Sequence, residues 1–216
     1  MLANVRRDPS AILLLTQLAG LLLYPFMEGN DVGRALFSVF GIAILGLVLL
    51  AVRRTPALTW IAVTIGIPTT LLLLIQAMTQ DDALTPYSSA LEAVLYLYAA
   101  GALIVYMLAD HEITRDELFA VGATFTLVAW AFAHLYTVNQ AIEPQSFTAA
   151  IDPAGDRSWV ELLFLSFTCL SGVGLGDIMP VTSPARVLVM LEEFAGVGYI
   201  AAIVSRLIGL TIRDKR

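Results

Sequence analysis

Long apolar runs decide what this chain of 216 residues can fold into. A helix needs about 20 apolar residues to cross the hydrocarbon of a membrane. Six apolar runs in this chain are long enough by this measure. A seventh run, Trp159–Leu170, is shorter and reaches only about half of the distance at ~1.5 Å per residue. The sequence therefore predicts an all-α membrane protein with six transmembrane helices, at Ala11–Met27, Ala35–Val52, Leu58–Met78, Ser89–Ala109, Leu118–Val138 and Ala185–Leu210.

The distribution of Lys and Arg predicts the orientation of these spans, because cytoplasmic loops are enriched in both residues. With the N-terminus inside, nine basic residues are cytoplasmic and three are external. Both termini are then cytoplasmic in a multi-pass protein of the cell membrane. The inner residues are Arg6, Arg7, Arg53, Arg54, Arg115, Arg206, Arg213, Lys215 and Arg216, and the outer ones are Arg34, Arg157 and Arg186.

Composition also excludes several classes of function. The net charge is −6 and no basic patch exists, which argues against a nucleic-acid partner. No nucleophile triad or pair of catalytic carboxylates is present, so we do not expect an enzyme. His111 and His134 are far apart in the predicted topology and Cys169 is the single cysteine, so no metal-binding cluster or other cofactor site is expected.

The segment after Leu170 reads Ser-Gly-Val-Gly-Leu-Gly-Asp, with glycines at positions 172, 174 and 176. Glycine adopts positive φ without a Cβ penalty. A backbone that alternates between the two signs of φ can point successive carbonyls the same way, and carbonyls arranged around an axis replace the water shell of a cation. Helix-packing glycines in membranes recur every four residues instead.

The run before this segment predicts a re-entrant helix. Ser158-Trp159-Val160-Glu161 fits a capping box, and the helix would continue to about Leu170. Its C-terminal end carries the negative pole of the helix dipole, which favours a nearby cation. Irregular backbone at membrane depth is tolerated where it lines a cavity. Because one chain cannot close a ring of carbonyls, the prediction requires a homotetramer with three further copies of the chain, embedded in membrane lipid.

From about Leu118 onward the chain resembles the two-helix pore module of the bacterial potassium-channel superfamily. The filter segment resembles the signature Thr-Val-Gly-Tyr-Gly-Asp, Asp177-Ile178-Met179-Pro180 resembles the exit from that filter, and Glu192 to Gly196 resembles a Glu followed by a hinge glycine. The resemblance implies K+ ions held by backbone oxygens of Gly172, Val173, Gly174 and Leu175, with Gly176 at the outer mouth. It also implies support from Thr168, Ser171, Asp177 and Glu192, and a possible gating hinge at Gly196.

The chain departs from this signature at two filter positions. Gly172 replaces the usual Thr, so the innermost site lacks a hydroxyl ring, and a Gly172→Thr change is expected to restore it. Leu175 replaces the usual Tyr, so apolar packing is expected in place of hydrogen bonds to the pore helix. Phe164 and Leu165 stand where family pore helices often carry Trp. Strict selectivity for K+ over Na+ is therefore less firmly implied than conduction.

The first four spans resemble a voltage-sensor bundle in number alone. A voltage sensor needs several basic residues in its fourth span, whereas Ser89–Ala109 contains none. The sequence thus predicts a four-span domain at residues 1–110 and a pore domain at residues 111–216. The predicted function is a passive, voltage-independent cation channel that conducts K+. A weakly selective Na+/K+ channel and a non-conducting sensor or scaffold are the alternatives.

Overall fold

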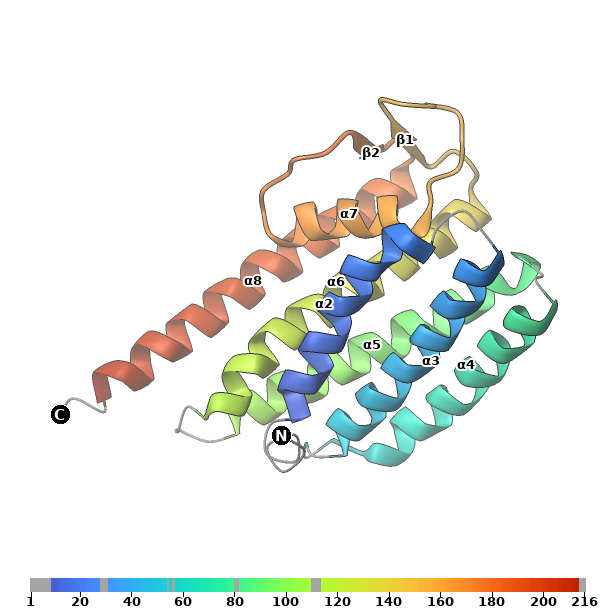
Figure 1. Ribbon diagram of the computed structural model, residues 1–216. Coiled ribbons are helices and arrows are strands. Elements are labelled where there is room, and N and C mark those ends of the chain that lie inside the picture. Colours follow the sequence, from blue (N-terminus) through green and yellow to red (C-terminus); the bar gives the residue numbers. More distant parts are fainter. Residues whose placement is uncertain are drawn as a thin grey trace. The chain divides into compact units, whose positions relative to one another are not determined.

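The computed structural model describes residues 9–27, 31–53, 55, 57–79, 82–109 and 114–213. Several residues used above to predict orientation or exclude a metal site lie outside these ranges: Arg6, Arg7, Arg54, His111, Lys215 and Arg216. The chain forms two compact units, residues 1–128 and 129–216. The helices and strands of each unit are labelled in Figure 1. The boundary falls inside one long helix, whereas the predicted boundary at 110/111 lies in the connection before that helix.

The first unit consists of helices in chain order. They are α2 (Pro9–Met27), α3 (Asp31–Val52), α4 (Thr59–Thr79), the short 3₁₀ helix η1 (Asp82–Leu84), α5 (Thr85–Leu108) and the first half of α6 (Arg115–Ile142). Helix α3 contacts α2, α4 and α5, and α4 also contacts α5. Small buried residues on α5 let neighbouring helices approach closely, as is usual in membranes: Ala93, Ala99, Ala100 and Ala102.

The start of α6 is tied both to its own first turn and to α2. Thr114 and Glu117 form a reciprocal capping box, with Glu117 N donating to Thr114 Oγ1 over 3.2 Å and Thr114 N donating to Glu117 Oε2 over 3.1 Å. Between them, the Asp116 carboxylate accepts from Ser10 N at 2.9 Å and from Ser10 Oγ at 3.0 Å. Asp116 therefore caps α2 from a different helix, where first-turn amides otherwise lack partners.

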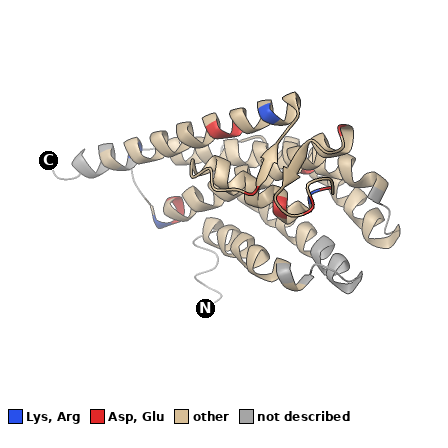
Figure 2. Cartoon of the chain, turned by 90° about the horizontal axis from the view of Figure 1, so that it is seen from above, with Lys and Arg blue, Asp and Glu red and all other residues tan. Residues whose placement is uncertain are grey.

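Four helices within the described residues are long and apolar enough to cross a membrane: Thr59–Thr79, Thr85–Leu108, Arg115–Ile142 and Ser183–Arg206. They overlap the third to sixth predicted spans. The described apolar parts of α2 and α3 are shorter, at Pro9–Tyr24 and Phe40–Val52. Figure 2 shows that charged residues are sparse along the described helices. The chain is therefore a membrane protein by length and composition of its helices, and six spans remain a prediction.

The second unit contains the glycine-rich segment. It contains the second half of α6, strand β1 (Phe147–Ala149), helix α7 (Trp159–Leu170), strand β2 (Ile178–Pro180) and helix α8 (Ser183–Arg213). Helix α7 contacts both α8 and β2. The two strands pair antiparallel, with Thr148 opposite Met179, and Val181 N extends the pairing to Ser146 O at 2.9 Å. The sequence analysis did not predict this pair because each strand has three residues.

Candidate functional site

Helix α7 starts where the capping box was predicted. Ser158 N donates to Glu161 Oε2 over 2.7 Å, and Glu161 N donates to Ser158 Oγ over 3.4 Å. The Ser158 backbone is extended, as an N-cap residue requires. This prediction is confirmed, and the helix ends at Leu170 as expected. The glycine-rich segment therefore begins directly at the C-terminal end of α7.

The last turn of α7 holds the beginning of the glycine-rich segment. The carbonyl oxygen of Thr168 accepts from Val173 N at 3.1 Å and from Gly174 N at 3.0 Å. The hydroxyl of Ser171 lies 3.3 Å from the same oxygen. Gly172 and Gly174 have φ of 70° and 63°, a region that other residues rarely adopt. Gly176 does not share this positive φ.

The amides at the start of this segment are thus hydrogen-bonded, whereas its carbonyl oxygens are exposed. Residues 171–177 are exposed, and Val173 and Leu175 are each 68% exposed. None of the described residues donates a hydrogen bond to the carbonyl oxygens of residues 172–175. The apolar packing expected around Leu175 is therefore missing within the single chain, because Leu175 has too little of its side chain covered. The exposed Asp177 carboxylate likewise has no hydrogen-bond partner among the described side chains.

Glu192 belongs to a buried polar cluster next to α7. Its side chain is 0% exposed and contacts residues on two other helices. Oε2 accepts from the Tyr136 hydroxyl of α6, and Oε1 is hydrogen-bonded to Ser166 Oγ of α7. Ser166 Oγ also lies 2.7 Å from the Ala129 carbonyl oxygen. The cluster connects α6, α7 and α8 at one point, whereas the neighbouring Glu193 is exposed.

Tyr136 and Ser166 were not identified by the sequence analysis. The available signal was a hydroxyl group inside an otherwise apolar helix, since polar groups at membrane depth need a partner. That signal identifies candidates without saying which of them meet. Tyr136 also packs edge-on against the buried Phe147 of β1, with ring centroids 5.2 Å apart. The polar cluster around Glu192 is therefore in contact with the strand pair.

Gly196 lies where α8 crosses the end of α7. A Cβ built on Gly196 would meet the backbone oxygen, carbon and Cα of Leu170. Such contacts are too short for a real side chain and involve backbone atoms that cannot rotate away. The structure therefore gives Gly196 a packing role at this crossing. The hinge implied by the resemblance is not needed to explain this glycine.

An aromatic contact lies at the start of α7. Trp159 packs edge-on against Trp130 of α6 with ring centroids 5.5 Å apart, and His134 lies next to Trp159 at 5.7 Å. Leu165, at one of the positions where Trp was noted as missing, is buried. No group of three or more His, Cys, Asp or Glu residues in the described part of the chain is arranged to hold a metal ion.

The arrangement of residues 129–213 is therefore a short capped helix, an open glycine-rich segment and a long apolar helix beside it. The model of a family described as ion channel matches residues 123–213. This region is similar to ion channels. The matched region contains every contact described around Thr168, Glu192 and Gly196, and it covers fewer than half of the 216 residues. Comparisons with curated proteins and with solved structures found no significant match.

The positive φ at Gly172 changes the expected effect of Gly172→Thr. A β-branched residue is strongly disfavoured in that conformation, at a cost of about 1–2 kcal/mol. We therefore expect Gly172→Thr to lower the melting temperature of the purified protein in K+ buffer. Gly101→Thr is the control, because Gly101 lies in α5 with nothing within 4 Å of its added Cβ. Equal melting temperatures for both variants would contradict the assigned backbone conformation.

Proposed function

We propose that this chain forms a passive cation channel that conducts K+ through the backbone carbonyls of residues 172–175. The observation that carries the proposal is the positive φ of Gly172 and Gly174 within an exposed segment whose amides bond back to Thr168. Carbonyls freed in this way can replace the hydration shell of a dehydrated cation. The match of residues 123–213 to an ion channel family supports the same reading.

The proposed channel is a homotetramer in the cell membrane. One chain supplies one column of carbonyls, and a closed ring needs further copies around an axis. Exposed apolar side chains on the segment and on α8 support burial against lipid or other copies: Val173, Leu175, Val187, Met190, Leu191, Phe194, Val197 and Val204. Six spans with both termini in the cytoplasm would place Asp177 at the outer mouth.

A weakly selective Na+/K+ channel is the second candidate, and Gly172 is the observation that favours it. Without a side-chain hydroxyl at this position, an ion in the innermost site keeps water from the cavity in its shell. The number and field strength of the ligands set the preference for K+. A hydrated inner site would therefore discriminate less between K+ and Na+.

The proposal is tested by ion flux into liposomes that contain the purified protein. We expect Rb+ and K+ uptake that depends on the protein, and bi-ionic reversal potentials in planar bilayers then give the ratio of K+ to Na+ permeability. A ratio near one would favour the weakly selective channel. A purified tetramer that passes neither ion in any lipid, pH or potential would indicate a non-conducting sensor or scaffold.

We expect the open probability of this channel to depend weakly on voltage. Each charge that crosses the membrane field contributes ~2.3 kcal/mol per 100 mV, and α5 contains no Lys or Arg within Thr85–Leu108. Single-channel recordings over a wide range of potentials measure this dependence. A steep activation curve, equivalent to several gating charges per subunit, would contradict the expectation.

A further inference from the structure

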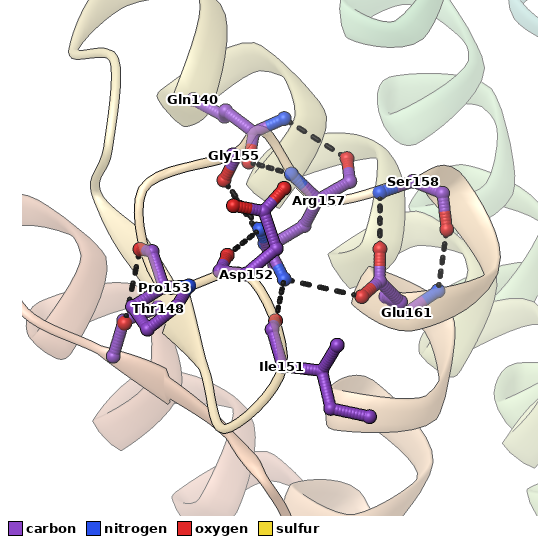
Figure 3. Close-up of polar contacts among 9 residues, drawn as sticks. All are labelled: Gln140, Thr148, Ile151, Asp152, Pro153, Gly155, Arg157, Ser158 and Glu161. Atoms are coloured by element: carbon purple, nitrogen blue, oxygen red, sulfur yellow. Dashed lines mark hydrogen bonds and ion pairs between the residues drawn. The ribbon is translucent and has the colours of Figure 1, made fainter.

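A compact loop outside the glycine-rich segment is organised by one buried arginine. We call residues 151–157 the outer loop. The side chain of Arg157 is 3% exposed, although it belongs to a loop whose other residues are mostly exposed. Its guanidinium donates to the carbonyl oxygens of Asp152 at 2.6 Å, Ile151 at 3.4 Å and Gly155 at 3.2 Å (Figure 3). One side chain thus closes the outer loop on itself.

Arg157 also connects the outer loop to the start of α7. Its Nη1 lies 3.3 Å from Glu161 Oε1. The other oxygen of the same carboxylate accepts from Ser158 N in the capping box. The carboxylate is therefore shared between the loop and the helix cap, as the dashed lines in Figure 3 show. Any displacement of the guanidinium would remove one of the partners that orient this cap.

Gln140 fixes the backbone of Arg157 to α6. The amide Nε2 of Gln140 donates to the Arg157 carbonyl oxygen over 3.0 Å, and Arg157 N donates to Gln140 Oε1 over 2.9 Å. This pair of hydrogen bonds resembles the exchange between two strands, but one partner is a side chain. The position of Arg157 is thus determined by a long helix and not only by the loop.

The outer loop also connects to β2, on the far side of the glycine-rich segment. Thr148 of β1 donates from Oγ1 to the Pro153 carbonyl oxygen over 3.2 Å. Strand β1 pairs with β2, which follows Asp177 directly. Hydrogen bonds therefore run from α7, which precedes the segment, through the outer loop and β1 to β2, which follows it. We call this connected set the outer frame.

We propose that Arg157 is a positioning residue for ion selectivity, because it completes the outer frame that holds both ends of the glycine-rich segment. This inference rests on the proposed channel function. The spacing of the carbonyls depends on where the segment starts and ends, and Leu175 supplies no hydroxyl that could fix its middle. The outer frame provides the missing restraint from outside the segment. Arg is suited to the task because its planar guanidinium presents several donors in fixed directions, which the single ammonium of Lys does not.

The test compares Arg157→Met and Arg157→Lys with Arg115→Met, which changes an exposed arginine at the start of α6. Hydrogen exchange of the amides of residues 172–177 is measured in purified tetramers, and K+/Na+ permeability ratios are measured in bilayers. We expect exchange about tenfold faster and a permeability ratio lower by about tenfold in Arg157→Met, since hydrogen bonds to a charged group are lost. Arg157→Lys keeps the charge but is expected to restore neither the exchange rate nor the permeability ratio. Arg115→Met is expected to match the wild type in both.

Wild-type exchange rates and permeability ratios in Arg157→Met would overturn the inference. Full recovery of both values in Arg157→Lys would also overturn it, because the effect would then come from the positive charge near the mouth. If Arg157→Met does not assemble, Gln140→Met decides by the same two measurements, because it removes both bonds to the Arg157 backbone without changing charge. A wild-type protein that conducts no ions would refute the proposed function and, with it, the role in selectivity. The exchange measurement would then still show whether Arg157 positions the segment.

Discussion

Gly196→Ala is expected to disrupt the packing of α8 against the end of α7. The added Cβ would lie 2.8 Å from the carbonyl carbon and 2.9 Å from the Cα of Leu170. Overpacking a well-filled interior costs about 1–3 kcal/mol, and we expect the upper end here because the obstacle is backbone.

Gly198→Ala is the matched control for this substitution. Gly198 lies two residues further along α8, and its added Cβ would meet nothing within 4 Å. Melting temperature and the fraction of assembled protein in detergent, measured for both variants, should fall for Gly196→Ala alone. A stable Gly196→Ala protein with altered open probability would instead support the gating hinge, and would contradict the packing role.

Glu192→Leu is expected to weaken both stability and ion flux. Leu fills a similar volume but accepts no hydrogen bond, so the buried Tyr136 hydroxyl loses its acceptor. A buried polar group without a partner costs about 1–3 kcal/mol. Because Ser166 belongs to α7 and lies two residues before Thr168, whose carbonyl binds the glycine-rich segment, the loss is expected to reach that segment.

Glu192→Gln and Glu193→Leu separate this effect from a change of charge or hydrophobicity. Gln can accept from Tyr136 and donate to Ser166, so the variant should keep most of the stability and flux. Glu193 is exposed, and Glu193→Leu should be mild. Melting curves and liposome flux for the three variants test the order. If Glu193→Leu were as damaging as Glu192→Leu, the buried cluster would not be the support of the segment.

Local patterns in the sequence predicted much of the helical architecture. Apolar runs of sufficient length indicated the four helices that the structure leaves as candidate spans. The capping box at Ser158 and Glu161 predicted the first turn of α7, because its contacts span three residues. The alternate glycines at 172 and 174 indicated backbone with positive φ, because no other residue adopts it at so little cost.

Contacts between distant residues were decided by tertiary structure alone. The sequence singled out Glu192, but its bonds to Tyr136 and Ser166 depend on the rotation and axial position of three helices, which no local pattern records. The same holds for Gly196, whose small size matters because Leu170 crosses it. Arg157 was only a charge on an outer loop in the sequence. Its burial follows from carbonyls that the folded loop brings around it, since a buried cation is stable only where the chain supplies enough acceptors.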